Sequence, residues 1–140
     1  MPGIAYLRLA SAHVARYQGN LAEARRRYEE ALRLLQELGN RRRMAICLMG
    51  LAAIDVREKA FERALVLMGA ADPMSEAGGI QLAPADEDEY QRAVVEIRSR
   101  MEDAEIDRLR RRGREMDLTQ VFELAFDVIP MTGDRTRSGA

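Results

Sequence analysis

Cysteine, lysine and histidine each occur once in this 140-residue chain, and tryptophan is absent. The single cysteine, Cys47, excludes a disulfide framework and a cysteine-based metal cluster. His13 has no second histidine with which to share a metal, and no convergent nucleophile and base is visible. We therefore predict a protein that is not an enzyme, with no catalytic residue, no metal site and no cofactor. In this interpretation His13 is a groove or surface side chain and Cys47 is a buried, unreactive thiol.

Long apolar stretches and β-branched runs are also missing. No stretch approaches the roughly 20 apolar residues that span a bilayer, and the N-terminus lacks the basic-then-apolar layout of a signal peptide. The short β-branched runs disfavour a sheet. The formal net charge is −1, so no overall charge draws the chain to nucleic acid or to a membrane. We expect an all-α, cytoplasmic protein that contacts neither membrane nor nucleic acid directly.

The chain repeats itself after 40 residues, with small residues matched to small ones and large residues to large ones. A fixed period between 20 and 50 residues is typical of repeat architectures. In stacked helical hairpins each unit buries its apolar face on its neighbours, and alanines lie where two helix backbones approach closely. The repeat therefore favours a binding scaffold. The matched pairs are Ala12/Ala52, Ala24/Ala64, Ala31/Ala71, Leu21/Phe61, Tyr28/Met68 and Val14/Ile54.

Apolar residues at helical spacing predict seven helices. Gly19-Asn20 and Gly39-Asn40 are expected to close the first two, and Asp72-Pro73 to end the fourth. Asp117 and Thr119 are candidate caps of the last helix. In the first helix, Leu7, Ala10, Val14 and Tyr17 lie on one stripe at helical spacing. The predicted helices cover residues 4–17, 21–37, 43–57 and 61–71, then a segment that starts near Asp86 after a loop at 76–85, then 103–116, and a last helix to about Val128, which Pro130 stops.

Three regions follow from this layout. Residues 1–75 form two helical hairpins, residues 76–129 form a three-helix C-terminal cap, and residues 130–140 lack apolar content and are predicted to be disordered. Two hairpins are fewer than the three or more repeats that usually make such a stack stable. The first hairpin is therefore expected to expose apolar surface. Either the chain is a piece of a longer stack, or two copies pack together there as a homodimer.

Two sequence runs carry a resemblance to a known family. Gly19-Asn20-Leu21-Ala22-Glu23-Ala24, with Tyr28 and Ala31-Leu32 after it, resembles the second half of a tetratricopeptide repeat. The 40-residue spacing, the run from Ala64 to Ala71 and the following segment resemble the tetratricopeptide regions of MalT-like, LuxR-type bacterial transcriptional regulators. The resemblance implies a right-handed solenoid of about two hairpins with a helical cap, over roughly residues 4–128.

The sequence departs from that family at several points. Lys59 replaces the turn glycine of the second repeat, so this turn is expected to be strained or extended. Asp55 occupies a position that is usually aromatic or small in the family. The chain has no Walker-type phosphate loop and no helix-turn-helix, so the resemblance does not extend to ATPase activity or to sequence-specific DNA binding.

The resemblance also implies where a partner binds, because the first helix of each hairpin lines a groove in tetratricopeptide arrays. A half-apolar groove with aromatic and arginine anchors suits a peptide or a helix. The alternative is that these residues pack on the next hairpin or on a second chain. The candidate groove residues are Tyr6, Leu9, His13, Arg16, Tyr17, Ile46, Met49, Ala53, Val56 and Arg57.

Two functions remain open at this point. The first is a non-catalytic protein–protein interaction module that docks a peptide, a partner domain or a second copy. The second is a regulatory domain that senses a small-molecule effector in the groove. A discrete pocket between the first helices of the two hairpins would favour the second function, whereas a long shallow groove or one filled by another chain would favour the first.

Charged clusters have ordinary explanations. Arg41–Arg43 and the arginines of 108–114 could contact phosphate, but acidic residues lie one or two turns from the second group. A self-neutralised, solvated face is the preferred interpretation over nucleic-acid binding. The acids of 86–89 lack the loop of a calcium site and are interpreted as helix-start acids that favour the helix dipole.

Overall fold

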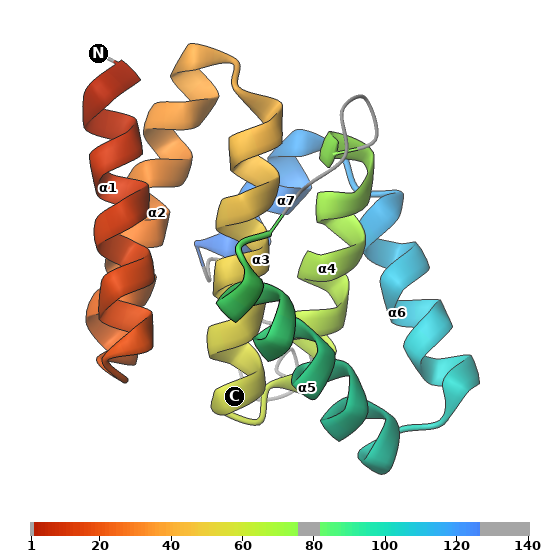
Figure 1. Cartoon of the computed structure of the whole chain (residues 1–140). Coiled ribbons are helices and arrows are strands. Elements are labelled where there is room, and N and C mark those ends of the chain that lie inside the picture. The colour runs from red at the N-terminus through yellow and green to blue at the C-terminus, as the bar shows by residue number, and fades with distance from the viewer. Residues whose placement is uncertain (1, 76–81, 127–140) are drawn as a thin grey trace, which may run out of the picture.

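The computed structural model describes residues 2–75 and 82–126, and this part of the chain is built from seven α-helices with no strand (Figure 1). The all-α prediction is confirmed. The predicted tail at 130–140 and most of the loop at 76–85 lie outside the described residues. The last helix was predicted to continue to about Val128, but it ends at Ala125, with Phe126 as its C-cap. The helices are α1 (Pro2–Tyr17), α2 (Leu21–Leu38), α3 (Arg41–Arg57), α4 (Phe61–Ser75), α5 (Pro84–Arg100), α6 (Asp103–Arg114) and α7 (Leu118–Ala125).

The residues predicted to form turns and caps lie at the ends of these helices. Gly19 (φ 81°) follows α1, and Gly39 (φ 68°) caps α2 in the left-handed conformation. The side-chain oxygen of Asn40 accepts a hydrogen bond from the backbone N–H of Arg43 at 3.1 Å and caps α3. Asp117 caps α7 through a reciprocal pair of hydrogen bonds with Gln120.

Lys59 has the left-handed conformation of Gly19, its counterpart 40 residues earlier. Its φ is 66°, and Lys59 is the one described residue other than glycine with a positive φ. This backbone shape costs a non-glycine residue about 1–2 kcal/mol. The turn is therefore strained, as expected, and it is not extended.

Two other predicted helix boundaries were also wrong. α4 continues through Asp72-Pro73 to Ser75. Pro73 cannot donate to the carbonyl four residues earlier, but it lies in the last turn, so only the end of the helix loses this hydrogen bond. The side chain of Met74 beyond it is buried. α5 begins at Pro84 rather than near Asp86, because proline is well suited to the first position of a helix.

The helices pack largely in chain order. α2 lies between α1 and α3, and α4 lies between α3 and α6, with α7 also against α4 (Figure 1). The apolar third helix is covered on both sides, as predicted: ten of its residues are buried. Every alanine of the three matched pairs is buried: Ala12, Ala24, Ala31, Ala52, Ala64 and Ala71.

Glycines allow two very close approaches in this core. A Cβ on Gly50 of α3 would lie 2.3 Å from Cζ of Tyr28, so the tyrosine ring of α2 rests directly on the α3 backbone. A Cβ on Gly69 would lie 2.0 Å from the carbonyl oxygen of Arg110, and one on Gly113 would lie 1.9 Å from that of Val66. The backbones of α4 and α6 therefore touch where they cross.

The stripe of α1 formed by Leu7, Ala10, Val14 and Tyr17 faces away from the core, and the first hairpin exposes apolar surface, as predicted. Leu7 is 71% exposed, and Val14 and Tyr17 are each 49% exposed; Ala10 is also exposed. The helix instead packs through a face of mostly small residues, because short side chains let its backbone approach α2 closely. The buried apolar residues of α1 are Ala5, Leu9, Ala12 and Ala15.

Candidate interaction groove

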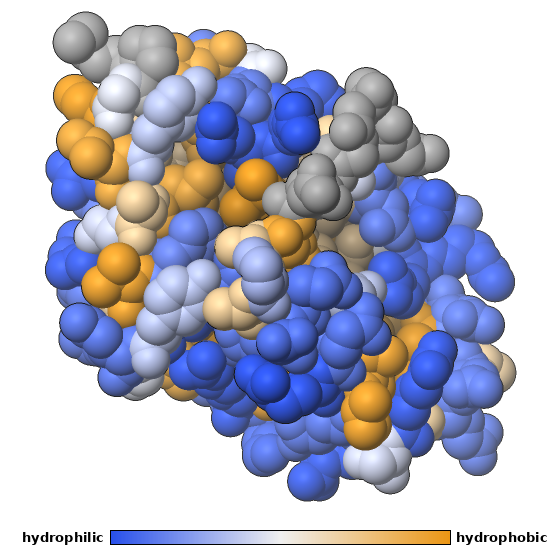
Figure 2. Space-filling view, viewed as in Figure 1, coloured by the Kyte–Doolittle hydropathy of each residue, from blue (hydrophilic) through white to orange (hydrophobic). Residues whose placement is uncertain are grey.

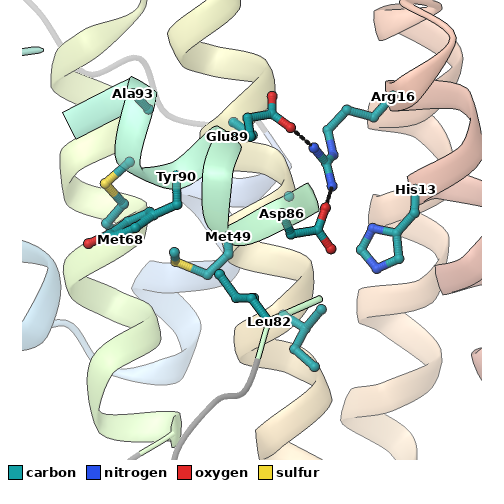
Figure 3. Close-up of a pocket in the computed structure, with 12 residues that line it drawn as sticks. His13, Arg16, Met49, Met68, Leu82, Asp86, Glu89, Tyr90 and Ala93 are labelled. Carbon is teal, nitrogen blue, oxygen red and sulfur yellow. Dashed lines mark hydrogen bonds and ion pairs between the residues drawn. The ribbon is translucent and has the colours of Figure 1, made fainter. Parts of the chain in front are cut away.

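The face of α1 and α3 that was predicted to form a groove is crossed by α5. Figure 1 shows α5 in front of the C-terminal half of α3, and α5 contacts α3. The acidic side chains of its first turns point toward α1 (Figure 3). The groove is therefore occupied at its centre by a helix of the same chain.

Arg16 is the residue on which this arrangement converges. Its side chain is only 3% exposed. Its Nη2 atom donates a hydrogen bond to Oδ1 of Asp86 at 2.7 Å, and its Nη1 atom donates to Glu89 (Figure 3). Arg57 of α3 donates from Nε to the second oxygen of Glu89 at 3.0 Å and from Nη1 to the backbone carbonyl of Arg16 at 3.0 Å. The hydroxyl of Tyr17 donates to Asp86 at 2.6 Å.

Behind Arg16 lies Tyr28 of α2, whose side chain is fully buried. Nε of Arg16 donates to the Tyr28 hydroxyl oxygen at 2.9 Å. The same oxygen lies 2.5 Å from Nδ1 of His13. With its lone pair facing Arg16, the hydroxyl is positioned to donate its proton to a neutral imidazole. Arg16 thus links the α2 core to the acidic turn of α5.

Burial and charge set the protonation states of this cluster. Burial lowers the pKa of His13 below 6.5 and outweighs the opposing field of Asp86, so the imidazole is neutral near pH 7. Burial also lowers the pKa of Arg16, but its contacts with Tyr28, Asp86 and Glu89 outweigh this effect and raise it above its usual value. Burial raises the pKa of Asp86, and the hydrogen bonds from Tyr17 and Arg16 reverse the shift, so it titrates below its usual range.

A small cavity lies beneath α5, lined in part by His13, Met49, Leu82 and Tyr90 (Figure 3). Its volume is about 30 Å³. This space admits one or two water molecules, whereas pockets for small organic ligands are about 300–1,000 Å³.

Two larger openings lie among the described residues, one at the N-terminal parts of α1 and α3 and the other between α3 and α5. One of about 410 Å³ is lined by Tyr6, Asn40, Arg42, Arg43 and Ile46, and the guanidinium of Arg43 stacks 4.2 Å from the centre of the Tyr6 ring. The second, of about 280 Å³, includes Ala53, Val56 and Arg57 from α3 together with Glu89, Arg92, Ala93 and Glu96 from α5. Both include residues of the predicted groove.

The ten predicted groove residues therefore divide into three sets. Leu9 is 5% exposed and belongs to the core, so it does not contribute to a groove. Tyr6 and Ile46 border the opening of about 410 Å³, and Ile46 also lines the cavity beneath α5. The remaining seven border α5 itself, by its ion pairs, its cavity or the second opening: His13, Arg16, Tyr17, Met49, Ala53, Val56 and Arg57.

Three arginines of 108–114 have acidic partners. Arg108 pairs with Glu105 of its own helix, and Arg114 pairs with Asp72 of α4 at 2.8 Å. Arg110 lies 3.7 Å from the same aspartate. These contacts are those of a self-neutralised surface.

A second buried ion cluster holds the two hairpins together. Asp55 is 1% exposed and accepts hydrogen bonds from Arg25 of α2 at 2.8 Å and from Arg63 of α4 at 3.1 Å. Burial raises the pKa of Asp55 and outweighs both arginines. The unusual acid in the repeat is thus an ionic link among α2, α3 and α4.

The described residues contain no metal-binding cluster of three or more histidine, cysteine, aspartate or glutamate side chains. Cys47 is fully buried, and burial raises the pKa of its thiol well above the usual range. Within 2–75 and 82–126, no helix combines the length and the hydrophobicity that a bilayer crossing needs.

Comparisons with known proteins identify no relative: no family model, no curated protein and no solved structure matches the chain. The assignment of a function therefore rests on the sequence and the geometry.

The placement of α5 is the part of this site that the sequence analysis missed. The sequence explains the acids at 86–89 only by their favourable position at the start of a helix, whereas in the structure Asp86 and Glu89 form ion pairs with Arg16. The signal available was charge complementarity: the predicted groove carried Arg16 and Arg57, and the chain's most acidic turn lay elsewhere in the same sequence.

Proposed function

We propose that this protein is a non-catalytic protein–protein interaction module of tetratricopeptide type, and that its docking surface is the outer face of α1. The observation that carries the proposal is the exposure of apolar residues on this helix. Ile4, Leu7 and Val14 are 46%, 71% and 49% exposed. Figure 2 shows apolar atoms at several places along α1 at the left edge of the molecule.

The internal repeat indicates what this face is suited to contact. The residues 40 positions later are Met44, Cys47 and Ile54, and each is no more than 2% exposed. They belong to α3, which packs against α2 of the preceding hairpin. The equivalent face of α1 has no such helix beside it among the described residues. An apolar face of this kind on one helix is typical of an interaction site.

The first partner we propose is a second copy of the chain. A two-fold interface uses the same patch on both copies, and a patch of aliphatic side chains can pack against its own copy. Its central residues are aliphatic or small. Its charged member, Arg8, stands where α3 has Leu48, and it points toward Glu30 of α2, 3.9 Å away. The face can therefore be covered without burying an unpaired charge.

The remaining parts of the proposal rest on the sequence resemblance. We place the chain among tetratricopeptide stacks of right-handed twist, related to the MalT-like regulators, in the cytoplasm. The order of helix packing and the burial of the repeated alanines support this relationship. The effector-sensing alternative is favoured by one observation: the opening of about 410 Å³ between the first helices of the two hairpins is within the size range of small-molecule sites. The cavity beneath α5, at about 30 Å³, is well below that range.

Sedimentation velocity on a charged variant of the face tests the proposal. The double substitution Leu7→Lys and Val14→Lys is expected to convert a dimer to a monomer, because burying two ammonium groups is unfavourable. Val95→Lys is the matched control: Val95 is 67% exposed but lies on α5, so this variant should remain a dimer. Equal sedimentation of all three proteins would contradict the proposed surface.

A further inference from the structure

We propose that the groove of α1 and α3 is a recognition site for an acidic amphipathic helix of another protein, and that α5 occupies it as an internal substitute. A partner helix would displace α5 and present its own carboxylates to Arg16 and Arg57. This surface lies on α3 and the C-terminal end of α1, apart from the outer face proposed above, and neither proposal depends on the other.

The packing of α5 indicates that it can leave. Of its 17 residues, only Ala93 and Ile97 are buried, whereas ten of the 17 residues of α3 are buried. Local stability follows the number of buried apolar contacts. α5 is attached in large part by ion pairs. Those at its exposed edge, such as Lys59 to Glu96 at 2.7 Å, are weak and sensitive to salt, whereas the buried pairs of Arg16 with Asp86 and Glu89 are the contacts that an incoming helix must replace.

The groove beneath α5 specifies the charge of any replacement. Arg16 is desolvated by α5 and by Tyr28, and a buried guanidinium without an acidic partner is strongly unfavourable. A neutral or basic helix in the groove would leave the guanidinium of Arg16 buried without an acidic partner. Only an occupant that supplies carboxylates can cover the groove at comparable free energy.

The spacing in α5 describes the partner more closely. Asp86 and Glu89 lie three residues apart, so they project from one face of the helix, and they contact Arg16 together. Tyr90, Ala93 and Ile97 continue the inner face, with Tyr90 and Ala93 over the cavity. We therefore expect a partner helix with two acids three residues apart in its first turns, followed by a small or apolar residue at each later turn.

A labelled synthetic peptide with the sequence of residues 84–100 serves as the probe, and fluorescence anisotropy measures its binding to the full chain. In the chain variant Asp86→Asn with Glu89→Gln the internal helix loses its charged contacts. This variant should bind the probe at least tenfold more tightly than the unaltered chain. The matched control is the chain variant Glu87→Gln with Asp88→Asn, whose altered side chains are exposed; it should bind like the unaltered chain.

The probe itself is varied in the same way. Replacing its two acids that correspond to Asp86 and Glu89 should weaken binding at least tenfold, and Arg57→Glu in the chain should do the same. Indistinguishable binding of the probe variants would overturn the proposal, and so would equal binding by the three chains.

Hydrogen exchange of the unaltered chain provides a measurement that needs no variant to fold. The amides of α5 should exchange at least tenfold faster than those of α3, and the difference should widen in 1 M salt, on the scale where charge pairs are screened. Exchange of α5 and α3 at one common rate would contradict a detachable helix. The double substitution Leu7→Lys and Val14→Lys should leave probe binding unchanged. The experiments therefore distinguish a failure of the proposed outer docking face from a failure of the proposed groove site.

Discussion

The contact between Gly50 and Tyr28 leads to a prediction in which the usual effect of a substitution changes sign. Gly→Ala in the middle of a helix normally stabilises a protein by about 0.5–1 kcal/mol, because alanine has less freedom to lose. At Gly50 the new Cβ would lie 2.3 Å from Cζ and 2.6 Å from the hydroxyl oxygen of Tyr28. The ring is fully buried and hydrogen-bonded to Arg16 and His13, so it has little room to move.

Overpacking of this kind costs about 1–3 kcal/mol, which exceeds the intrinsic gain. We expect Gly50→Ala to lower the free energy of unfolding by about 1–2 kcal/mol and Tm by about 4–8 °C. Urea unfolding followed by circular dichroism measures the change. A Gly50→Ala protein as stable as the parent, or more stable, would refute the reasoning.

A double-mutant cycle identifies the atom responsible. Tyr28→Met introduces the residue that the second repeat carries at the matching position, Met68, and a flexible methionine can move away from a new methyl group. In that background Gly50→Ala should be neutral or stabilising, a coupling of about 1 kcal/mol or more. Additive effects of the two substitutions would show that the tyrosine ring is not the obstacle.

Three further predictions concern stability. Lys59→Gly should raise the free energy of unfolding by about 1 kcal/mol by relieving the left-handed backbone at φ 66°. Lys59→Ala keeps the strained backbone and should give no such increase. Equal effects of the two substitutions on urea unfolding would contradict this. Asp55→Ala should cost about 3 kcal/mol, because Arg25 and Arg63 lose a buried carboxylate, and a loss below 0.5 kcal/mol would show that the cluster contributes little. Burial lowers the pKa of His13, so the unfolded state binds its proton first: stability should fall as the pH drops from about 6.5 toward the lowered pKa, by up to about 1.4 kcal/mol per pH unit. Thermal unfolding between pH 7 and 5 should show this dependence of stability on pH in the parent and a weaker dependence in His13→Phe. The same dependence in both proteins would show that a group other than His13 causes it.

Local features of the fold were predictable from the sequence. Gly19, Asn40 and Asp117 act within their own turns, where side-chain hydrogen bonds and left-handed backbone are set by neighbouring residues. The repeated alanines were also predictable, because a period that preserves size reports helix backbones in close contact. The end of α4 was predicted wrongly because the rule that a proline ends a helix does not say how many helical residues can follow the proline.

Long-range features were not predictable. In α1, periodicity identified Leu7 and Val14 as one face, but a pattern cannot tell whether a neighbouring helix covers that face. The ion pair between Arg16 and Asp86 joins residues 70 positions apart, and no local motif marks it. Gly50 gave no signal either, because its role depends on the ring of Tyr28, which reaches it from another helix.

The mass of the unaltered chain in solution tests the central claim, that the outer face of α1 docks a protein partner and serves a second copy first. Light scattering across a concentration series measures it directly. The proposal predicts a mass of twice the 15.8 kDa of one chain at high concentration, with dissociation on dilution. A constant mass of one chain at every concentration would contradict self-association through this face.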